Sequence, residues 1–232
     1  MDTDIGTSLQ QPALEAFNGL TPDQYALVMQ KGRVKKLQAK AYLFHQGDPA
    51  VNCFLVNQGR LKLTKLNEQG KEAIIRYVGP GELTAAVAVL RNRTYPVTAE
   101  AAAETNLTLW DKPAMMDLMH QYPDITINLL SMALERLDEL QQRYLEICTE
   151  QVDQRIARSL LRFMQRAGVK VPHGIKIDIP LSRQNIADYT GTTLFTVSRT
   201  ISRWEKRGWV KSGRESIIVT DPHALVQFAE TG

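Results

Sequence analysis

The 28 residues that follow Pro123, up to Gln151, contain no glycine or proline and separate two unlike parts of the chain. The apolar residues among them repeat with the a and d spacing of a coiled coil over about three heptads, at Leu130, Ala133, Leu137, Leu140, Tyr144 and Ile147. A helix packed only on its own domain would carry similar residues. The stripe is narrow, however, and charged residues fill much of the opposite face, with Arg136 and Arg143 flanking the stripe. We therefore predict one long helix over residues 123–151 whose apolar stripe forms a homodimer interface.

The residues before this helix have the pattern of an antiparallel β domain. Short apolar runs alternate with turn residues from about Lys35 to Leu109. Gly59 separates two of these runs, and residues 67–70 have the composition of a hairpin turn. Short strands at this spacing predict a sandwich or barrel.

The residues after the long helix predict a winged helix-turn-helix. An amphipathic helix and a short alternating strand come first. Ser182 then caps a helix that Gly191 ends, and Thr192 or Thr193 caps a second helix. A hairpin with Gly213 near its tip follows and supplies the wing. Two helices joined by a short glycine-containing turn are typical of DNA-binding helix-turn-helix motifs.

The charges are unevenly distributed along the chain. Residues 1–150 contain 15 Lys and Arg against 18 Asp and Glu, whereas residues 151–232 contain 13 against 7. The net charge is therefore −3 in the first part and +6 in the second. A basic C-terminal part favours a polyanionic partner, although a solvated basic surface would give the same count.

The second helix of the motif has two unlike faces. Val197, Ile201 and Trp204 share the apolar face. The residues predicted to contact DNA lie along the rest of the helix: Thr193, Phe195, Thr196, Ser198, Arg199, Arg203 and Lys206. Arg can bind guanine through two hydrogen bonds, and hydroxyl groups can bind phosphates or base edges. An ordinary solvated helix carries such residues too, but the turn, the wing and the local charge all favour double-stranded DNA.

Four sequence strings carry a resemblance that spans the chain. They are FHQGDPA, VNQGRLKL and VGPGEL in the first part, and LSRQNIADYTGTTLFTVSRTISRWEKRG in the second. In this order they resemble the Crp/Fnr family of transcriptional regulators. The last string is the most specific by its length, whereas GPGEL alone would be weak.

The resemblance implies an α+β chain with a β-roll of the cyclic-nucleotide-binding type, or jelly roll, before the dimerisation helix and the winged helix-turn-helix. The expected segments are an N-terminal arm at 1–20, the β-roll sensor at 21–122, the dimerisation helix at 123–151 and the DNA-binding domain at 152–232. Residues 1–19 are expected to be loosely ordered.

The resemblance also implies an effector site in the β-roll. The residues that correspond to it are Gly81, Glu82, Leu83, Arg93, Thr94 and Gln141. In cyclic-nucleotide binders the Gly-Glu-Leu string holds the ribose hydroxyls, the Arg-hydroxyl pair clamps the phosphate, and the dimer helix meets the base.

Two departures from that pattern leave the effector open. The stretch between Leu83 and Arg93 is apolar and one residue longer than in cyclic-AMP binders, and Leu140 and Gln141 stand where the cyclic-AMP sensor has hydroxyl side chains. A cyclic nucleotide is therefore one candidate effector, beside a different metabolite or none.

Haem is disfavoured as a cofactor. Its potential ligands are candidates by residue type only: Cys53, His45, His120 and His173. Two cysteines cannot supply a four-cysteine iron–sulfur cluster.

The recognition helix departs from its relatives at one position. Many members of the family carry Glu where this chain has Phe195, and that Glu accepts a hydrogen bond from cytosine. The pair Ser198–Arg199 is retained. We expect Arg199 to read guanine, and Phe195 either to contact a thymine methyl group or to pack on the first helix.

Other functional classes find little support in the sequence. It contains no HExxH, GxSxG, phosphate-loop or Rossmann glycine motif, so we expect a protein that is not an enzyme. It has no secretory signal and no apolar run long enough for a membrane helix, which predicts a cytoplasmic protein. RNA polymerase is an expected partner. The alternative function is a sensor whose winged helix binds protein rather than DNA.

Overall fold

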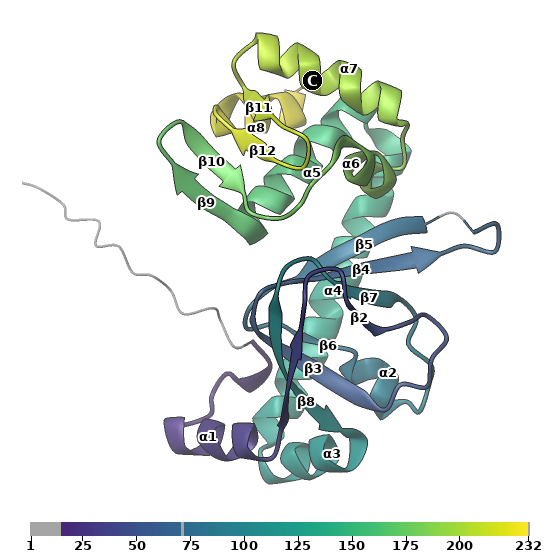
Figure 1. The fold of residues 1–232 in the computed structure, drawn as a ribbon, viewed down its shortest axis with the longest axis vertical. Coiled ribbons are helices and arrows are strands. Elements are labelled where there is room, and N and C mark those ends of the chain that lie inside the picture. The colour runs from purple at the N-terminus through teal and green to yellow at the C-terminus, as the bar shows by residue number, and fades with distance from the viewer. Residues whose placement is uncertain (1–14, 71, 232) are drawn as a thin grey trace, which may run out of the picture.

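The computed structural model describes residues 15–70 and 72–231. A β domain and a smaller helical domain lie at opposite ends of the molecule, and the long helix α4 (Pro123–Thr149) runs from one to the other (Figure 1). This arrangement confirms the α+β fold expected from the sequence. Among the described residues, none of the helices has both the length and the apolar character needed to cross a membrane.

The N-terminal segment packs more closely than expected. Residues 1–14 of the predicted arm lie outside the described residues. The short helix η1 (Glu15–Phe17) buries Phe17 against Trp110, and the side chain of Asn128 on α4 donates a hydrogen bond of 2.8 Å to the Asn18 carbonyl. The expectation of a loosely ordered arm is therefore wrong for residues 15–19, because these contacts bury an aromatic side chain. Helix α1 (Pro22–Gln30) follows.

The β domain consists of two four-stranded antiparallel sheets that face each other. One sheet has the order β1 (Arg33–Leu37), β8 (Thr105–Asp111), β3 (Asn52–Gln58) and β6 (Leu83–Thr84). The other has the order β2 (Tyr42–Phe44), β7 (Thr98–Ala101), β4 (Leu61–Leu66) and β5 (Glu72–Val78). Buried apolar residues from both sheets, among them Phe54, Leu61 and Leu107, form one core cluster. The predicted hairpin turn is confirmed, since the Gly70 amide donates to the Asn67 carbonyl at 3.0 Å and Gly70 has a φ of 76°.

The β domain contains one short helix between two of its strands, and a second helix connects it to α4. Helix α2 (Ala86–Leu90) lies between β6 and β7, and α3 (Lys112–Gln121) leads into α4. Helix α4 ends at Thr149, two residues before the predicted end, because Glu150 has extended backbone angles and Gln151 caps the next helix. The apolar stripe of α4 is exposed in the protomer, where Leu130 is 62% and Leu140 is 55% accessible.

The C-terminal domain is built around a buried cluster that includes Leu160, Ile186 and Trp204. Helix α5 (Val152–Ala167) buries one face in this cluster. The remaining helices are α6 (Arg183–Thr190), α7 (Leu194–Lys206) and α8 (Pro222–Thr231). An antiparallel sheet has the order β11 (Val210–Ser212), β12 (Ile217–Val219), β10 (Gly174–Ile177) and β9 (Gly168–Val171).

Candidate nucleic-acid interface and cavity

Local hydrogen bonds set the two helices of the predicted motif. The Ser182 hydroxyl accepts from the Asn185 amide at 3.1 Å, and the Asn185 side chain accepts from the Ser182 amide at 2.9 Å. Gly191 ends α6 with a left-handed φ of 67°. Thr193, rather than Thr192, caps α7, because its hydroxyl accepts from the Thr196 amide at 3.2 Å.

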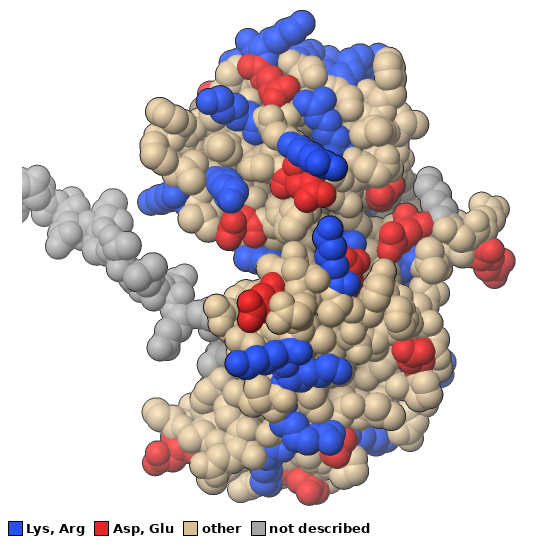
Figure 2. Space-filling model, viewed as in Figure 1, with Lys and Arg blue, Asp and Glu red and all other residues tan. Residues whose placement is uncertain are grey.

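Helix α7 buries one face and exposes the other. Val197, Thr200, Ile201 and Trp204 are buried in the domain core. Phe195 is 74% accessible, Arg199 and Lys206 are exposed, and Thr196 and Ser198 are half-buried. Lys and Arg side chains gather at the end of the molecule that α7 occupies (Figure 2). This end therefore presents a helix with basic and hydroxyl side chains to a partner, as DNA-binding helices do.

An ion pair fixes the wing relative to the two helices. Arg183 on α6 lies 3.3 Å from the carboxylate of Glu205 on α7. It also donates a hydrogen bond of 2.8 Å to the Ser212 hydroxyl on β11. Glu205 also accepts from the Ser212 amide at 2.9 Å. The sequence analysis did not find these residues, because the three positions are far apart in the chain and only the fold brings them together.

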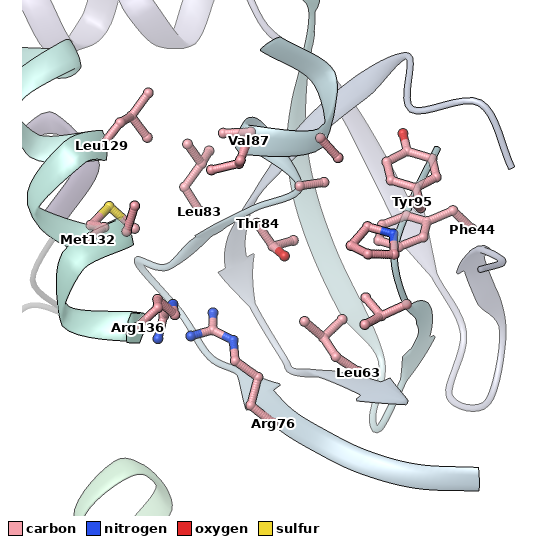
Figure 3. A pocket seen from close by; sticks show the side chains of 16 residues that line it. Phe44, Leu63, Arg76, Leu83, Thr84, Val87, Tyr95, Leu129, Met132 and Arg136 are labelled. Carbon is pink, nitrogen blue, oxygen red and sulfur yellow. The ribbon is translucent and has the colours of Figure 1, made fainter. Parts of the chain in front are cut away.

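A cavity of about 420 Å³ lies between the β domain and the first half of α4. Most of its wall is apolar, including Phe44, Leu63, Leu83, Tyr95, Leu129 and Met132. Arg76 from β5 and Arg136 from α4 approach each other at one end of this wall (Figure 3). A hollow of this size and lining is typical of small-molecule sites.

Over most of its length the chain is similar to transcriptional regulators. The chain is 21% identical over 213 residues to the CRP-like cAMP-activated global transcriptional regulator of Mycobacterium tuberculosis, covering 92% of this chain and 95% of the relative. It is 27% identical over 202 residues to the transcriptional activator protein anr of Pseudomonas aeruginosa, covering 87% and 82%. The solved structure of FixK2 from Bradyrhizobium japonicum has the same fold, with a TM-score of 0.73, 22% identity and coverage of 84% and 96%.

Two domain families match separate parts of the chain. Residues 34–122 match the cyclic nucleotide-binding domain, and residues 154–228 match the Crp-like helix-turn-helix domain. The chain belongs to the Crp/Fnr family of transcriptional regulators. It is therefore a DNA-binding regulator with an effector-type β-roll, and the alternative in which the winged helix binds protein instead of DNA is disfavoured.

The structure of this Crp/Fnr protein brings only some of the expected effector residues to the cavity. Leu83 lines it. Glu82 lies beside it, with Oε1 at 3.6 Å from Arg76 Nη1 and 3.5 Å from Arg136 Nη2, while Oε2 accepts from the Gly79 amide at 2.6 Å. Gly81 forms the preceding turn, and its amide donates to the Val56 carbonyl at 2.8 Å.

The other expected effector residues lie outside the cavity lining. Arg93 and Thr94 are exposed in the loop after α2, and the cavity wall begins with the next residue, Tyr95. Gln141 is exposed on α4, more than one turn beyond Arg136, the last residue of that helix to line the cavity. The cavity lining of the protomer therefore does not include the residues to which the family resemblance assigned the phosphate clamp and the base contact. The cavity instead contains Arg76 and Arg136, which the sequence analysis did not assign to it.

Arg203 is exposed on α7 and also contacts α5. Its guanidinium forms an ion pair and hydrogen bond with the carboxylate of Asp153 on α5, and the Thr200 hydroxyl donates to the same carboxylate at 2.7 Å. Partial burial acts to raise the pKa of Asp153, but the hydrogen bonds from Thr200 and Arg203 outweigh it and hold that pKa below its ordinary value. Arg203 thus fastens α7 to α5 in this regulator.

Charged residues connect the cavity to the DNA-binding domain. Arg136 lies 3.9 Å from Glu139 one turn further along α4, and Glu139 forms an ion pair with Arg166 of α5. Close by, Arg143 donates to the carbonyls of Ile75 and Tyr189, both at 3.1 Å. The β-roll, α4 and the helix-turn-helix of this Crp/Fnr protein therefore meet through arginines.

Cys53, one of the candidate haem ligands by residue type, lies in the interior of the β domain. Cys53 is buried, and its thiol donates to the Trp110 carbonyl at 3.5 Å. Burial raises the pKa of Cys53 to about 12, so the thiol stays protonated and is a poor ligand. Within the part of the chain that the structure describes, His, Cys, Asp and Glu form no group of three or more that could hold a metal ion.

Proposed function

We propose that this regulator works as a homodimer that binds a near-palindromic operator in double-stranded DNA and is controlled by a small molecule in the β-roll cavity. The observation that carries the proposal is the outer face of α7, where exposed Phe195, Arg199 and Lys206 stand on a helix whose other face is buried. We place its action in the cytoplasm, where operator DNA and RNA polymerase are its expected partners.

The exposed stripe of α4 supports the homodimer. Leu130, Leu137 and Leu140 stand on one face of a helix of 27 residues and are each about half exposed or more in the protomer. Ala133, Tyr144 and Ile147 continue that stripe. An apolar stripe of this length in contact with water is costly, and pairing it with a second copy of the same helix removes it from water. The dimer in turn sets two α7 helices about one turn of DNA apart.

The residues on α7 have different proposed roles in DNA binding: base contact, phosphate contact and capping of the helix. Arg199 reads a guanine in each half-site through its two-donor edge, with Ser198 and Thr196 beside it. Phe195 meets the neighbouring base pair, where it favours a thymine methyl group. Lys206 at the end of the helix contacts phosphate, and Thr193 holds the start of α7 in position.

The ion pairs between the cavity and α5 supply a route for control. A ligand that binds Arg136 competes with Glu82 and Glu139 for that guanidinium, and Glu139 holds Arg166 of α5. Effector binding therefore changes the relative stability of different orientations of the DNA-binding domains. Glu82 serves to hold Arg76 and Arg136 at the cavity wall rather than to bind a sugar.

Selection of binding sites from random DNA tests the proposal. The native protein is expected to recover a two-fold motif with a guanine in each half, and Arg199→Ala is expected to lose that guanine. Arg91→Ala, which removes an exposed charge from the β-roll, is the matched control and should recover the native motif. A native selection without two-fold symmetry, or an undiminished guanine with Arg199→Ala, would overturn the proposed recognition.

A further inference from the structure

A buried guanidinium without a hydrogen-bond partner stands at the end of the cavity. Arg76 is only 9% accessible, and its Nη1 atom has no hydrogen-bond partner in the described structure. The nearest carboxylate oxygen, Oε1 of Glu82, is 3.6 Å away, beyond hydrogen-bonding distance. A buried charged donor without a partner is costly, so the site favours an acceptor that fills this place.

The charges at this end of the cavity leave room for one more negative group. The guanidinium groups of Arg76 and Arg136 approach each other at the cavity wall (Figure 3), and Glu82 is the carboxylate that pairs with both. Arg136 also lies 3.9 Å from Glu139, which in turn pairs with Arg166, so these three arginines and two carboxylates have a net charge of +1. A single added anion balances it, whereas a second negative charge would exceed it.

The rest of the wall favours an apolar ligand body. Leu83, Val87, Leu129, Met132 and the ring of Tyr95 surround the space next to the arginines. The Tyr95 hydroxyl is already used, because it donates to the Asn52 carbonyl at 2.8 Å. Thr84 is then the remaining uncharged polar side chain among the lining residues that the structure describes. A sugar or a nucleobase would lose its hydrogen bonds to water here without replacing them.

We propose that the cavity binds an apolar molecule that carries one carboxylate, and that Arg76 and Arg136 hold this carboxylate between them. The inference rests on the proposed role of the cavity as the effector site and names the chemical class of the effector. Arg–carboxylate pairs are short and geometrically specific, so the arginines orient the ligand while the apolar wall supplies its burial. Its apolar body lies against Leu129 and Met132, which belong to α4 and adjoin the proposed dimer stripe.

Calorimetric titration of the full-length protein with straight-chain carboxylates tests this class. Hexanoate, octanoate and decanoate are the probes, octan-1-ol is the neutral control, and cyclic AMP is the competing chemistry. We expect at least one carboxylate to bind and octanol to bind about ten- to a hundredfold more weakly, because it cannot form charge-assisted hydrogen bonds. Arg76→Gln should remove this difference, whereas Arg91→Gln should keep it.

A second variant covers the case in which Arg76→Gln does not fold, which thermal unfolding would reveal. Val87→Trp fills the half-exposed mouth of the cavity without touching the arginines and should abolish carboxylate binding. Equal binding of octanol and octanoate, tighter binding of cyclic AMP than of every carboxylate, or no carboxylate binding at all would overturn the proposed class. Operator binding by the native protein is measured in parallel, so the proposed DNA-binding function can stand when the ligand class fails.

Discussion

The guanidinium of Arg199 lies over the face of Phe195, with its central carbon 6.0 Å from the ring centroid. The two residues are one helical turn apart at the exposed N-terminal part of α7. Such a cation–π contact is weak in water and strengthens as water is excluded. The aromatic ring thus lies beside the arginine on the exposed face of α7, at the position where the family resemblance implies a glutamate.

Phe195→Glu is expected to change the base preference next to the guanine. A carboxylate at this position can accept a hydrogen bond from the cytosine amino group, whereas the phenyl ring can contact a thymine methyl group. Binding-site selection should show a shift from thymine to cytosine in each half-site, with a change of about 1–3 kcal/mol per base pair. Phe195→Leu keeps an apolar side chain and serves as the control. An unchanged motif with Phe195→Glu would mean that this residue does not face the bases.

Lys206→Gln is expected to weaken binding to all DNA sequences alike. Lys206 is exposed at the last turn of α7, where a lysine meets phosphates rather than base edges. Loss of one phosphate contact per subunit should lower the slope of log affinity against log salt by about 0.9 for each contact. Titrations of operator and unrelated DNA at several salt concentrations measure this slope. A selective loss of operator binding would instead indicate base contact.

Leu137→Glu is expected to convert the dimer into monomers. Burial of a leucine contributes about 1.5–3 kcal/mol. Because both subunits carry the substitution, the dimer loses two buried leucines. The buried carboxylates would also repel each other. Sedimentation velocity should show the monomer mass and a loss of operator affinity. Gln142→Glu adds a charge to the same helix outside the apolar stripe and should leave the mass unchanged. A dimer mass for Leu137→Glu would contradict the proposed interface.

The elements set by local sequence could be predicted well. Ser182, Gly191 and Thr193 determine both ends of α6 and the start of α7 through hydrogen bonds within a few residues, so the helix-turn-helix follows from the sequence alone. The heptad pattern likewise predicted α4, apart from its last two residues. Each of these features depends on neighbours in the chain.

The cavity could not be predicted in the same way, because its residues come together only through the tertiary fold. Arg76 lies within an apolar strand and Arg136 on the long helix, and no local pattern connects them. Arg93 and Thr94 matched a family string by position, but the longer stretch before them forms α2, and Ala85, at the N-cap of that helix, takes a left-handed φ of 66°. The pair then falls in an exposed loop, and Tyr95 is the first residue after it to line the wall.

Asp153→Asn is expected to loosen α7 from α5 and to change the acid stability of the protein. Because the folded-state pKa of Asp153 lies below its ordinary value, its ion pair stabilises the fold above the unfolded-state pKa of about 3.9. This contribution is lost as the pH falls from that value through the lower folded-state pKa. The carboxylate is partly exposed, so we expect a loss of on the order of 1 kcal/mol in the free energy of unfolding at neutral pH.

Urea unfolding of the native protein and of Asp153→Asn between neutral pH and about pH 3 measures this effect. The difference between the two proteins should be largest at neutral pH and shrink toward the acidic end, as the native carboxylate becomes protonated. Asp178→Asn is the matched control, because Asp178 is exposed and forms an ion pair with the nearby Lys176, 3.3 Å away. It should leave the unfolding free energy nearly unchanged, since exposed pairs contribute little. A difference for Asp153→Asn that persists undiminished at acidic pH would show that its ionisation does not stabilise the fold. The same variant should also weaken operator binding. Arg203 on α7 would lose the carboxylate of α5 that holds the helix in place.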